Sequence, residues 1–125
     1  MTAAPTTIKF HKHSQRLTLV IEGHESTLSA EFLRVHSPSA EVRGHGDSDG
    51  VLQVGKKDVR IKNMEYVGNY ALKITYSDGH DSGLYHWQYL DFLGKNQEAL
   101  WQEYLEKLEA AGAKRTAAFI ELKSV

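Results

Sequence analysis

The sequence predicts one α+β domain: a small antiparallel sheet, made of an N-terminal hairpin and a three-stranded meander, with a short helix and a C-terminal helical segment. Three observations favour this class. Apolar residues alternate along Tyr70–Tyr76, as on a half-buried strand. The Asp78-Gly79 dipeptide that follows is typical of a hairpin turn. Between Trp101 and Leu108, large residues recur at helical spacing. A length of 125 residues fits a single domain.

The N-terminal part is predicted to be a tail followed by a hairpin. Residues 1–7 contain a proline and small polar residues, which are typical of a flexible end. Apolar and β-branched residues then predict strands at Ile8–His11 and Leu17–Glu22, with a turn at His13–Arg16. Gly23-His24 breaks the pattern, so we expect the hairpin to end there.

A short helix and a loop are expected next. Ser29 is suited to cap a helix, and Glu31 lies in its first turn, where the helix dipole favours a negative charge. Pro38 makes continuation beyond Ser37 unfavourable. From Gly44 to Lys57 four glycines alternate with charged residues, which predicts an exposed loop.

The central segment predicts an antiparallel meander. Gly68-Asn69 suits a turn with a positive backbone angle at its first residue, and Asp78-Gly79 suits a type I′ turn. Near Asn63-Met64 the alternation of apolar and polar residues shifts by one position, which indicates a β-bulge. The three strands expected are Val59–Val67, Tyr70–Tyr76 and His80–Tyr85.

Two helical segments complete the predicted domain, which spans residues 8–112. The first, His86–Leu93, is expected to end at Gly94. The second begins after Asn96, has Glu103 and Lys107 as an exposed i,i+4 pair, and ends at Gly112. We expect Trp87, Leu90 and Leu93 of the first, and Trp101, Tyr104, Leu105 and Leu108 of the second, to face inward. Residues 113–125 are predicted to be a tail.

Composition excludes several classes of function. The formal charge is −1, which gives no electrostatic footprint for nucleic acid. No apolar run reaches the roughly 18 residues needed to span a bilayer. The start of the chain lacks the basic and apolar regions of a secretion signal, so a cytoplasmic protein is expected. The absence of cysteine excludes disulfides, a thiolate nucleophile and thiolate-bound zinc.

Two blocks of sequence resemble a known domain family. They are LSAEFLRVHSPSAEVRG (Leu28–Gly44) and VGNYALKITYSDGHDSGLYHWQYL (Val67–Leu90). The second contains GNYA, DGH and LYHWQYL elements, and the likeness extends from about Leu17 to Leu93. Together the blocks resemble the gamma-butyrobetaine hydroxylase-like N-terminal domain, also called DUF971. The resemblance implies an accessory domain that is not itself a catalyst.

The resemblance also implies where a metal site would lie. In gamma-butyrobetaine and trimethyllysine hydroxylases this domain precedes an oxygenase domain, supports dimer assembly and holds zinc through three cysteines and one histidine. Those ligand positions correspond to Ser37, Ser39, Val42 and His80 in this chain. Only His80 is a good zinc ligand, so the family's zinc site is predicted to be lost. No oxygenase domain follows in this sequence.

Two alternative metal sites remain open. His36, His45 and His80 could converge with Asp47 into a rebuilt zinc or iron site. His45-Gly46-Asp47 also has the H-x-D spacing of a two-histidine-one-carboxylate iron site, although that triad normally needs a barrel with more strands than this chain supplies. Against both, His80 suits a structural role, in which its ring makes hydrogen bonds that hold the hairpin against the preceding helix.

Surface recognition is the function that the sequence favours. Exposed aromatic residues anchor protein interfaces, although most aromatics of a small domain are needed in its core. We therefore predict a non-catalytic module that binds a protein partner or self-associates, with no cofactor, and a zinc- or iron-binding module as the alternative. The candidate interaction residues are Tyr85, Trp87, Tyr89 and Trp101, together with the Gly44–Lys57 loop.

Overall fold

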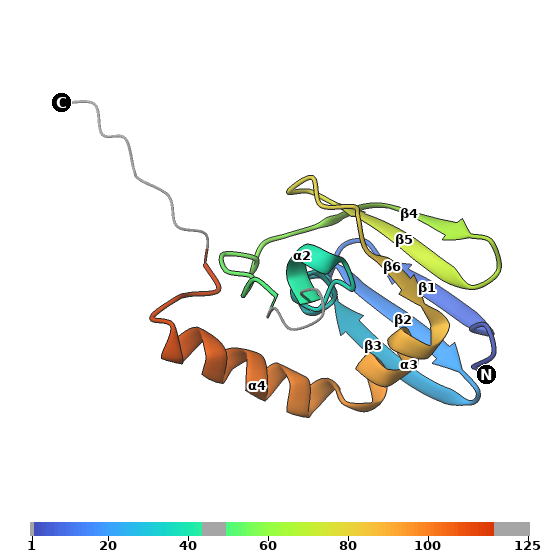
Figure 1. Ribbon diagram of the computed structural model, residues 1–125. Coiled ribbons are helices and arrows are strands. Elements are labelled where there is room, and N and C mark those ends of the chain that lie inside the picture. The colour runs from blue at the N-terminus through green and yellow to red at the C-terminus, as the bar shows by residue number, and fades with distance from the viewer. Residues whose placement is uncertain (1, 44–49, 117–125) are drawn as a thin grey trace.

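The computed structural model describes residues 2–43 and 50–116 and contains two three-stranded antiparallel sheets with helices packed around them (Figure 1). In the first sheet the strand order is β1 (Thr7–His11), β2 (Arg16–Ile21), β3 (His24–Ser29). In the second it is β4 (Ile61–Val67), β5 (Ala71–Tyr76), β6 (Leu84–His86). The helices are α1 (Ala30–Val35), α2 (Ala40–Arg43), α3 (Trp87–Lys95) and α4 (Gln97–Ala110). The α+β class is confirmed.

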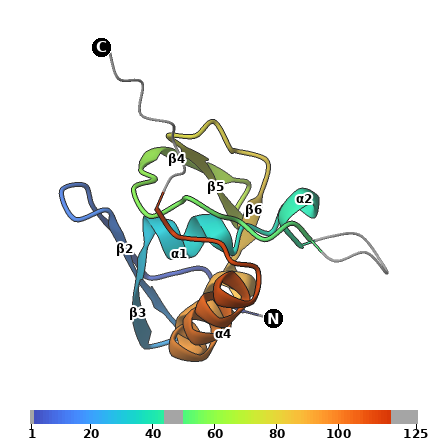
Figure 2. The same ribbon diagram turned by 90° about the vertical axis from the view of Figure 1, so that its left-hand side faces the viewer.

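One hydrophobic core joins the two sheets. The short helix α1 lies in the middle of the molecule, and all six of its residues are buried (Figure 2). Because a helix enclosed on all sides has no solvent-facing stripe, even its charged residues need partners inside the fold. The largest fully buried side chains come from both sheets and from α1 and α3: Tyr76, Tyr85, Phe32, Leu17, Leu19, Ile21, Leu28, Leu33, Ile74, Leu90 and Leu93.

The prediction that the first sheet ends at Gly23-His24 was wrong. Ile21 pairs with His24, so Glu22 and Gly23 form a two-residue turn, and both have positive φ angles of 49° and 79°. That combination defines a type I′ hairpin turn, which here leads into β3. The strand is hard to predict because Leu28 is its one fully buried apolar residue, while the rest of HESTLS is polar.

The start of α1 is as predicted. Ser29 has extended backbone angles, and its Oγ accepts a hydrogen bond from the Phe32 N–H at 3.0 Å. This contact satisfies one of the backbone donors that a helix leaves without a partner at its start. The helix ends at Val35, three residues before Pro38.

The first turn of the second sheet has the predicted positive φ at its first residue, but it spans the three residues between Val67 and Ala71, so the strand begins one residue later than predicted. Gly68 has φ +54°, and a Cβ at this position would lie 2.9 Å from the Tyr70 ring. The β-bulge predicted near Asn63-Met64 lies between Ile61 and Asn63.

The second turn differs from the predicted type I′. Gly79 N–H donates to the Tyr76 carbonyl and Tyr76 N–H donates to that of His80, both at 3.0 Å. Of Asp78 and Gly79, only Gly79 has a positive φ, at +88°. This is a three-residue turn in which Ser77 and Asp78 occupy the centre and Gly79 forms the bulge. The chain then leaves the sheet until Leu84, so the strand predicted at His80–Tyr85 is reduced to β6.

Gly94 does not end α3, contrary to prediction. The helix continues to Lys95, and a Cβ on Gly94 would lie 2.3 Å from Ser26 Oγ. The glycine therefore allows α3 to approach β3 closely rather than terminating the helix.

The sequence pattern of α4 largely predicts which of its side chains are buried and which are exposed. In α4, Tyr104 and Leu108 are buried, and Lys107 Nζ lies 3.0 Å from Glu103 Oε1. Residues 113–116 pass beside the segment from Gly55 to Lys57, and the rest of the predicted tail lies outside the described residues. Within residues 2–43 and 50–116 no helix has the length and apolar character needed to cross a membrane.

Candidate functional site

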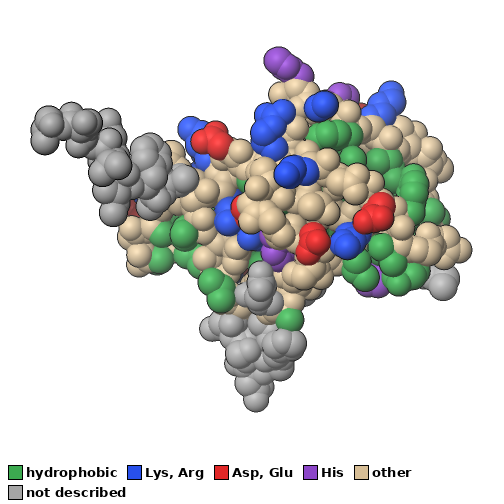
Figure 3. Space-filling model, turned by 90° about the horizontal axis from the view of Figure 1, so that it is seen from above, with side chains coloured by type: hydrophobic (Ala, Val, Ile, Leu, Met, Phe, Trp, Pro, Cys, Tyr) green, Lys and Arg blue, Asp and Glu red, His purple; other side chains and the backbone are tan. Residues whose placement is uncertain are grey.

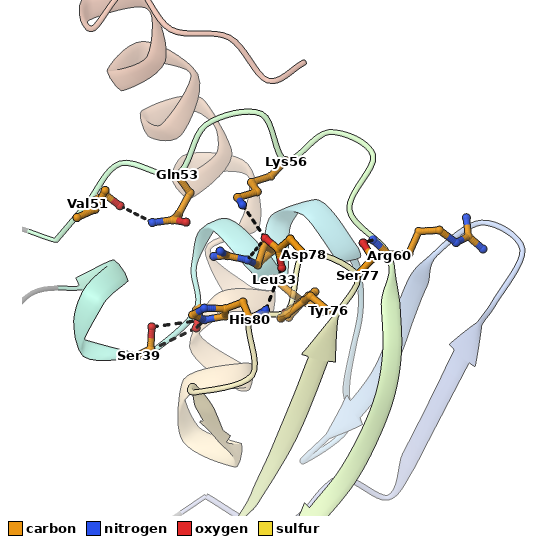
Figure 4. A network of polar contacts seen from close by, with 12 residues as sticks. Leu33, Ser39, Val51, Gln53, Lys56, Arg60, Tyr76, Ser77, Asp78 and His80 are labelled. Carbon is orange, nitrogen blue, oxygen red and sulfur yellow. Dashed lines mark hydrogen bonds and ion pairs between the residues drawn. The ribbon is translucent and has the colours of Figure 1, made fainter. Parts of the chain in front are cut away.

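The loop between β5 and β6 packs against the segment after α1 through a buried polar cluster (Figure 4). His80 Nε2 lies 2.7 Å from Ser37 Oγ and 3.5 Å from Ser39 Oγ. Ser37 is fully buried, and Ser39 and His80 are 6% and 8% exposed. The structure thus brings together three of the four positions at which the family resemblance implied zinc ligands. We call this group the Ser–His clip: Ser37, Ser39 and His80.

Asp78 supports the clip from the other side of the turn. Its Oδ1 accepts from the His80 N–H at 3.2 Å, and its Oδ2 lies 2.9 Å from Arg34 Nε and 2.6 Å from Lys56 Nζ. Burial acts to raise the pKa of Asp78, but the hydrogen bonds from Lys56 and His80 and the charge of Arg34 outweigh it and lower that pKa to about 2. The carboxylate therefore stays ionised and holds the turn to α1.

A pair of tyrosines lies behind this cluster. The Tyr85 hydroxyl donates to the Leu33 carbonyl at 2.6 Å and accepts from the Tyr76 hydroxyl at 2.6 Å. Burial raises the pKa of both phenols, and the mutual hydrogen bond adds to the rise for Tyr76. Both hydroxyls are therefore neutral hydrogen-bonding groups that fasten the second sheet to α1.

The donor atoms of the clip do not fit a zinc ion. Seryl hydroxyls are poor zinc ligands at neutral pH, and the nitrogen of His80 that faces them is already hydrogen-bonded to Ser37. The backbone leaves little space, because a Cβ on Gly83 would lie 2.4 Å from Ser37 Oγ and 2.9 Å from Pro38 Cδ. The residues at the family's metal position thus form a packed hydrogen-bonded contact.

The rebuilt metal site suggested by the sequence is only partly described. His36 Nδ1 donates to the Phe32 carbonyl at 2.9 Å, and its ring lies 4.4 Å from that of Phe32. Burial lowers the pKa of His36, which favours the neutral ring. His45 and Asp47 lie outside the described residues. Within residues 2–43 and 50–116, no three His, Cys, Asp or Glu side chains are grouped to hold a metal.

The four predicted interaction aromatics occupy different environments. Tyr85 is fully buried and Trp87 is 5% exposed, because both belong to the core that joins the sheets. Trp87 also donates from Nε1 to the Asn69 carbonyl at 2.7 Å. Tyr89 and Trp101 are half-buried at its margin. A partner can therefore reach Tyr89 and Trp101, but not the rings of Tyr85 and Trp87 in this fold.

Among the described residues, the large apolar side chains of Val51, Val54, Tyr66, Tyr70 and Phe92 are exposed, with exposed fractions from 46% to 68%. Val51 and Val54 belong to the predicted Gly44–Lys57 interaction loop, whereas sequence reasoning missed the other three. On the face formed by β4 and β5, basic and acidic side chains are interspersed and hydrophobic ones gather toward one end (Figure 3). The helical period of α3 is the sequence signal that could have shown Phe92 to be exposed. Phe92 lies outside the inward-facing stripe formed by Trp87, Leu90 and Leu93.

Phe92 and Val51 belong to an apolar groove between α3, α4 and the segment before β4. The groove has a volume of about 660 Å³. Tyr104 fixes its wall by donating to the Gln53 carbonyl at 2.7 Å. On its floor and sides are Val35, Val42, Leu52, Tyr89, Leu93 and Leu100, with His36, Glu103 and Lys107 at the polar positions.

Comparison with known proteins gives one consistent family. The family model described as "Gamma-butyrobetaine hydroxylase-like, N-terminal" matches residues 8–91. Two solution NMR structures are 46% and 44% identical, with TM-scores of 0.84 and 0.77; the alignments cover 99% and 98% of this chain, and 98% and 93% of the other chains.

A third structure and a further search complete the comparison. A crystal structure of a DUF971 family protein of unknown function from Acidithiobacillus ferrooxidans is 30% identical with a TM-score of 0.56, over 73% of this chain and 92% of that one. No curated protein matches. The chain belongs to the gamma-butyrobetaine hydroxylase-like N-terminal domain family, DUF971.

Proposed function

We propose that this domain is a non-catalytic protein-interaction module that holds its fold without a metal or other cofactor. The matched family is that of an N-terminal accessory domain, and no catalytic domain is evident in the chain. Its metal position contains the Ser–His clip, whose buried hydrogen bonds give the β5–β6 loop a fixed attachment to the segment after α1. The domain can thus present a preformed surface.

Phe92 is the observation that carries the proposal. Its side chain is 48% exposed, although it stacks on Tyr89 at 6.3 Å between ring centroids and lines the apolar groove. Grooves of roughly 300–1,000 Å³ that combine apolar walls with a few polar groups are typical binding sites. An aromatic ring that is held by a neighbour yet open to solvent anchors a partner with little loss of side-chain entropy.

The occupant that suits the groove is an uncharged amphipathic segment of a partner protein. Glu103 and Lys107 at its rim form an ion pair at 3.0 Å, so their charges compensate each other. Apolar side chains from Val51, Leu52 and Leu100 leave few polar groups for a charged or strongly polar ligand to pair with. A helix that places leucines on one face would bury these side chains.

A peptide titration tests this proposal. The probe is an end-blocked helical peptide with leucine at i, i+3, i+4 and i+7 and with alanine and glutamine elsewhere, added to the isotope-labelled full chain. We expect saturable NMR shifts at Phe92, Leu100 and Leu52. Phe92→Ser should weaken binding at least tenfold, whereas Tyr66→Ser, which removes a more exposed aromatic outside the groove, should leave it unchanged.

Four outcomes would contradict the proposed site or its occupant. Shifts that spread over the whole surface, or that persist in Phe92→Ser, would show that the groove is not the site. Shifts confined to Tyr66 and Tyr70 would place recognition on the second sheet instead. If the NMR signals of the groove residues shift when the concentration of the protein alone is raised, the occupant of the groove is a second copy of the chain and not a different protein.

A further inference from the structure

A second site lies at the start of α1, around the carboxylate of Glu31, whereas the serines of the Ser–His clip follow the end of this helix. Its side chain is only 7% exposed, in the first turn of a helix whose residues are all buried. Arg115 provides its partner: Nη2 lies 2.7 Å from Oε1 and Nε lies 2.9 Å from Oε2. Two parallel hydrogen bonds of this kind require the planar guanidinium group.

Trp101 forms the wall against which this guanidinium lies. The Arg115 Cζ is 5.1 Å from the centroid of the indole ring, within the range of a cation–π interaction. The same residues line a hollow of about 440 Å³, together with Gln15, Lys57 and Gln97. The guanidinium group of Arg115 therefore contacts a buried carboxylate through two of its nitrogens and an aromatic ring near its Cζ.

The chain around Arg115 is also held by its backbone. The carbonyl of Lys114 accepts from the Gly55 N–H and that of Arg115 from the Lys57 N–H, both at 3.0 Å. Lys56, between these two donors, places its Nζ 2.6 Å from Asp78 Oδ2. The position of the C-terminal segment is thereby linked to the carboxylate that supports His80.

We infer that Glu31 and Trp101 form an arginine-recognition pocket whose resident ligand is Arg115, and that filling this pocket fixes the Gly55–Lys57 segment and its Lys56–Asp78 contact. The ligand class is a guanidinium group. A lysine ammonium is a compact point charge, so it would hydrogen-bond only one carboxylate oxygen at a time. It also has no planar face that could lie against the indole ring. Without an occupant, Glu31 would be a buried carboxylate lacking its cation.

Chemical rescue tests the pocket in the full chain. Arg115→Ala removes the guanidinium but keeps the backbone, and n-propylguanidinium is then added as the probe, with n-butylammonium as the matched lysine analogue. We expect propylguanidinium to return the NMR signals of the Trp101 indole N–H and of the Gly55, Lys56 and Lys57 amides toward their wild-type positions. It should bind at least tenfold more tightly than butylammonium.

Two further variants make the result decisive. Glu31→Gln combined with Arg115→Ala should abolish rescue, whereas Arg16→Ala, which removes another arginine beside the same hollow, should leave wild-type signals of Trp101 and Lys56 in place. Equal effects of the two cations, or rescue that survives Glu31→Gln, would overturn arginine recognition. If Arg115→Ala shifted only the signals of residues 114–116, the link to Lys56 and the pocket itself would both be refuted.

Discussion

His80 Nε2 lies 2.7 Å from Ser37 Oγ, across 43 positions of sequence and inside the protein. The contact joins the loop after β5 to the segment after α1, which is where the family resemblance implied a zinc ion. A structural zinc ion fixes such a junction by bonds to four ligands. Here a hydrogen bond and close packing at Gly83 join the two segments, and we expect them to hold the junction without a metal ion.

The first prediction is that cysteines would restore metal binding at the clip. Ser37→Cys, Ser39→Cys and Val42→Cys together supply three thiolates beside His80, and Ser37 and Ser39 are already within 3.5 Å of its Nε2. We expect the triple variant to bind one equivalent of zinc, measured by elemental analysis, and to give thiolate charge-transfer absorption with cobalt(II).

The wild-type chain is the control for this experiment. Zinc or iron(II) added to it should cause no tight one-to-one shift of the His80, His36 and His45 signals, and a chelator should leave its folded spectrum unchanged. Joint shifts of these histidines in the wild type would instead establish the rebuilt metal site. Failure of the folded triple variant to bind zinc would show that Val42 or the clip is misplaced for the family's ligand geometry.

The second prediction compares the two buried tyrosines. Tyr85→Phe removes the donor to the Leu33 carbonyl and the acceptor for Tyr76, leaving two buried polar atoms without these partners, so we expect a loss of about 2–3 kcal/mol in the free energy of unfolding. Tyr76→Phe removes one donor and leaves the Tyr85–Leu33 bond in place, which should cost about 1 kcal/mol. Urea unfolding of both variants measures the difference. Equal losses would mean that the Leu33 carbonyl finds another donor.

The third prediction concerns acid. The folded pKa of Asp78 is about 2, below its usual value of 3.8, so its contribution to stability is complete above about pH 4 and is lost as the pH falls from 4 to 2. A quarter of the side chain is exposed, and solvent screening keeps this contribution near 1 kcal/mol. Urea midpoints between pH 5 and pH 2 should fall less steeply in Asp78→Asn than in wild type. Parallel slopes would assign the acid sensitivity to other carboxylates.

Local signals in the sequence predicted the elements whose geometry depends on near neighbours. The cap at Ser29 and the positive φ of Gly68 each depend on residues within three positions, and both are confirmed. The polar strand β3 was missed because its pairing with β2, including the hydrogen bond between Thr18 and Thr27 at 2.9 Å, compensates for its low apolar content. Such pairing between strands is not visible in the pattern of one segment.

Long-range contacts explain the other differences between the sequence-based prediction and the structure. Gly94 has the sequence appearance of a helix terminator, yet its role depends on Ser26, which lies 68 positions away. Arg115 lies in a segment that composition predicts to be a tail, and its partner Glu31 is 84 positions earlier. The candidate site shows the same division between local and long-range signals. The family motif located Ser37, Ser39 and His80, whereas the groove beside Phe92 depends on how α3, α4 and the Gly50–Gln53 segment pack together.

The fourth prediction tests whether packing at Gly83 sets the clip. In Gly83→Ala the added methyl would meet Ser37 Oγ at 2.4 Å, Pro38 Cδ at 2.9 Å and the Ser39 backbone nitrogen at 3.2 Å. Because one of these contacts is backbone and another is a proline ring, the segment must move, and we expect a loss of about 2–3 kcal/mol in the free energy of unfolding. The His80 ring signals should shift with it.

A double variant separates packing from any intrinsic preference for glycine at this position. Ser37→Ala removes the atom that makes the closest contact, so Ser37→Ala combined with Gly83→Ala should be less destabilised than the sum of the two single variants by about 1 kcal/mol. Gly83 does not have a positive φ, so alanine adds no left-handed backbone strain at this position and the clash is the main cost to be measured. If the losses at Ser37 and Gly83 simply add, the loop does not press on the clip, and the hydrogen bond between Ser37 and His80 must hold the junction without help from packing.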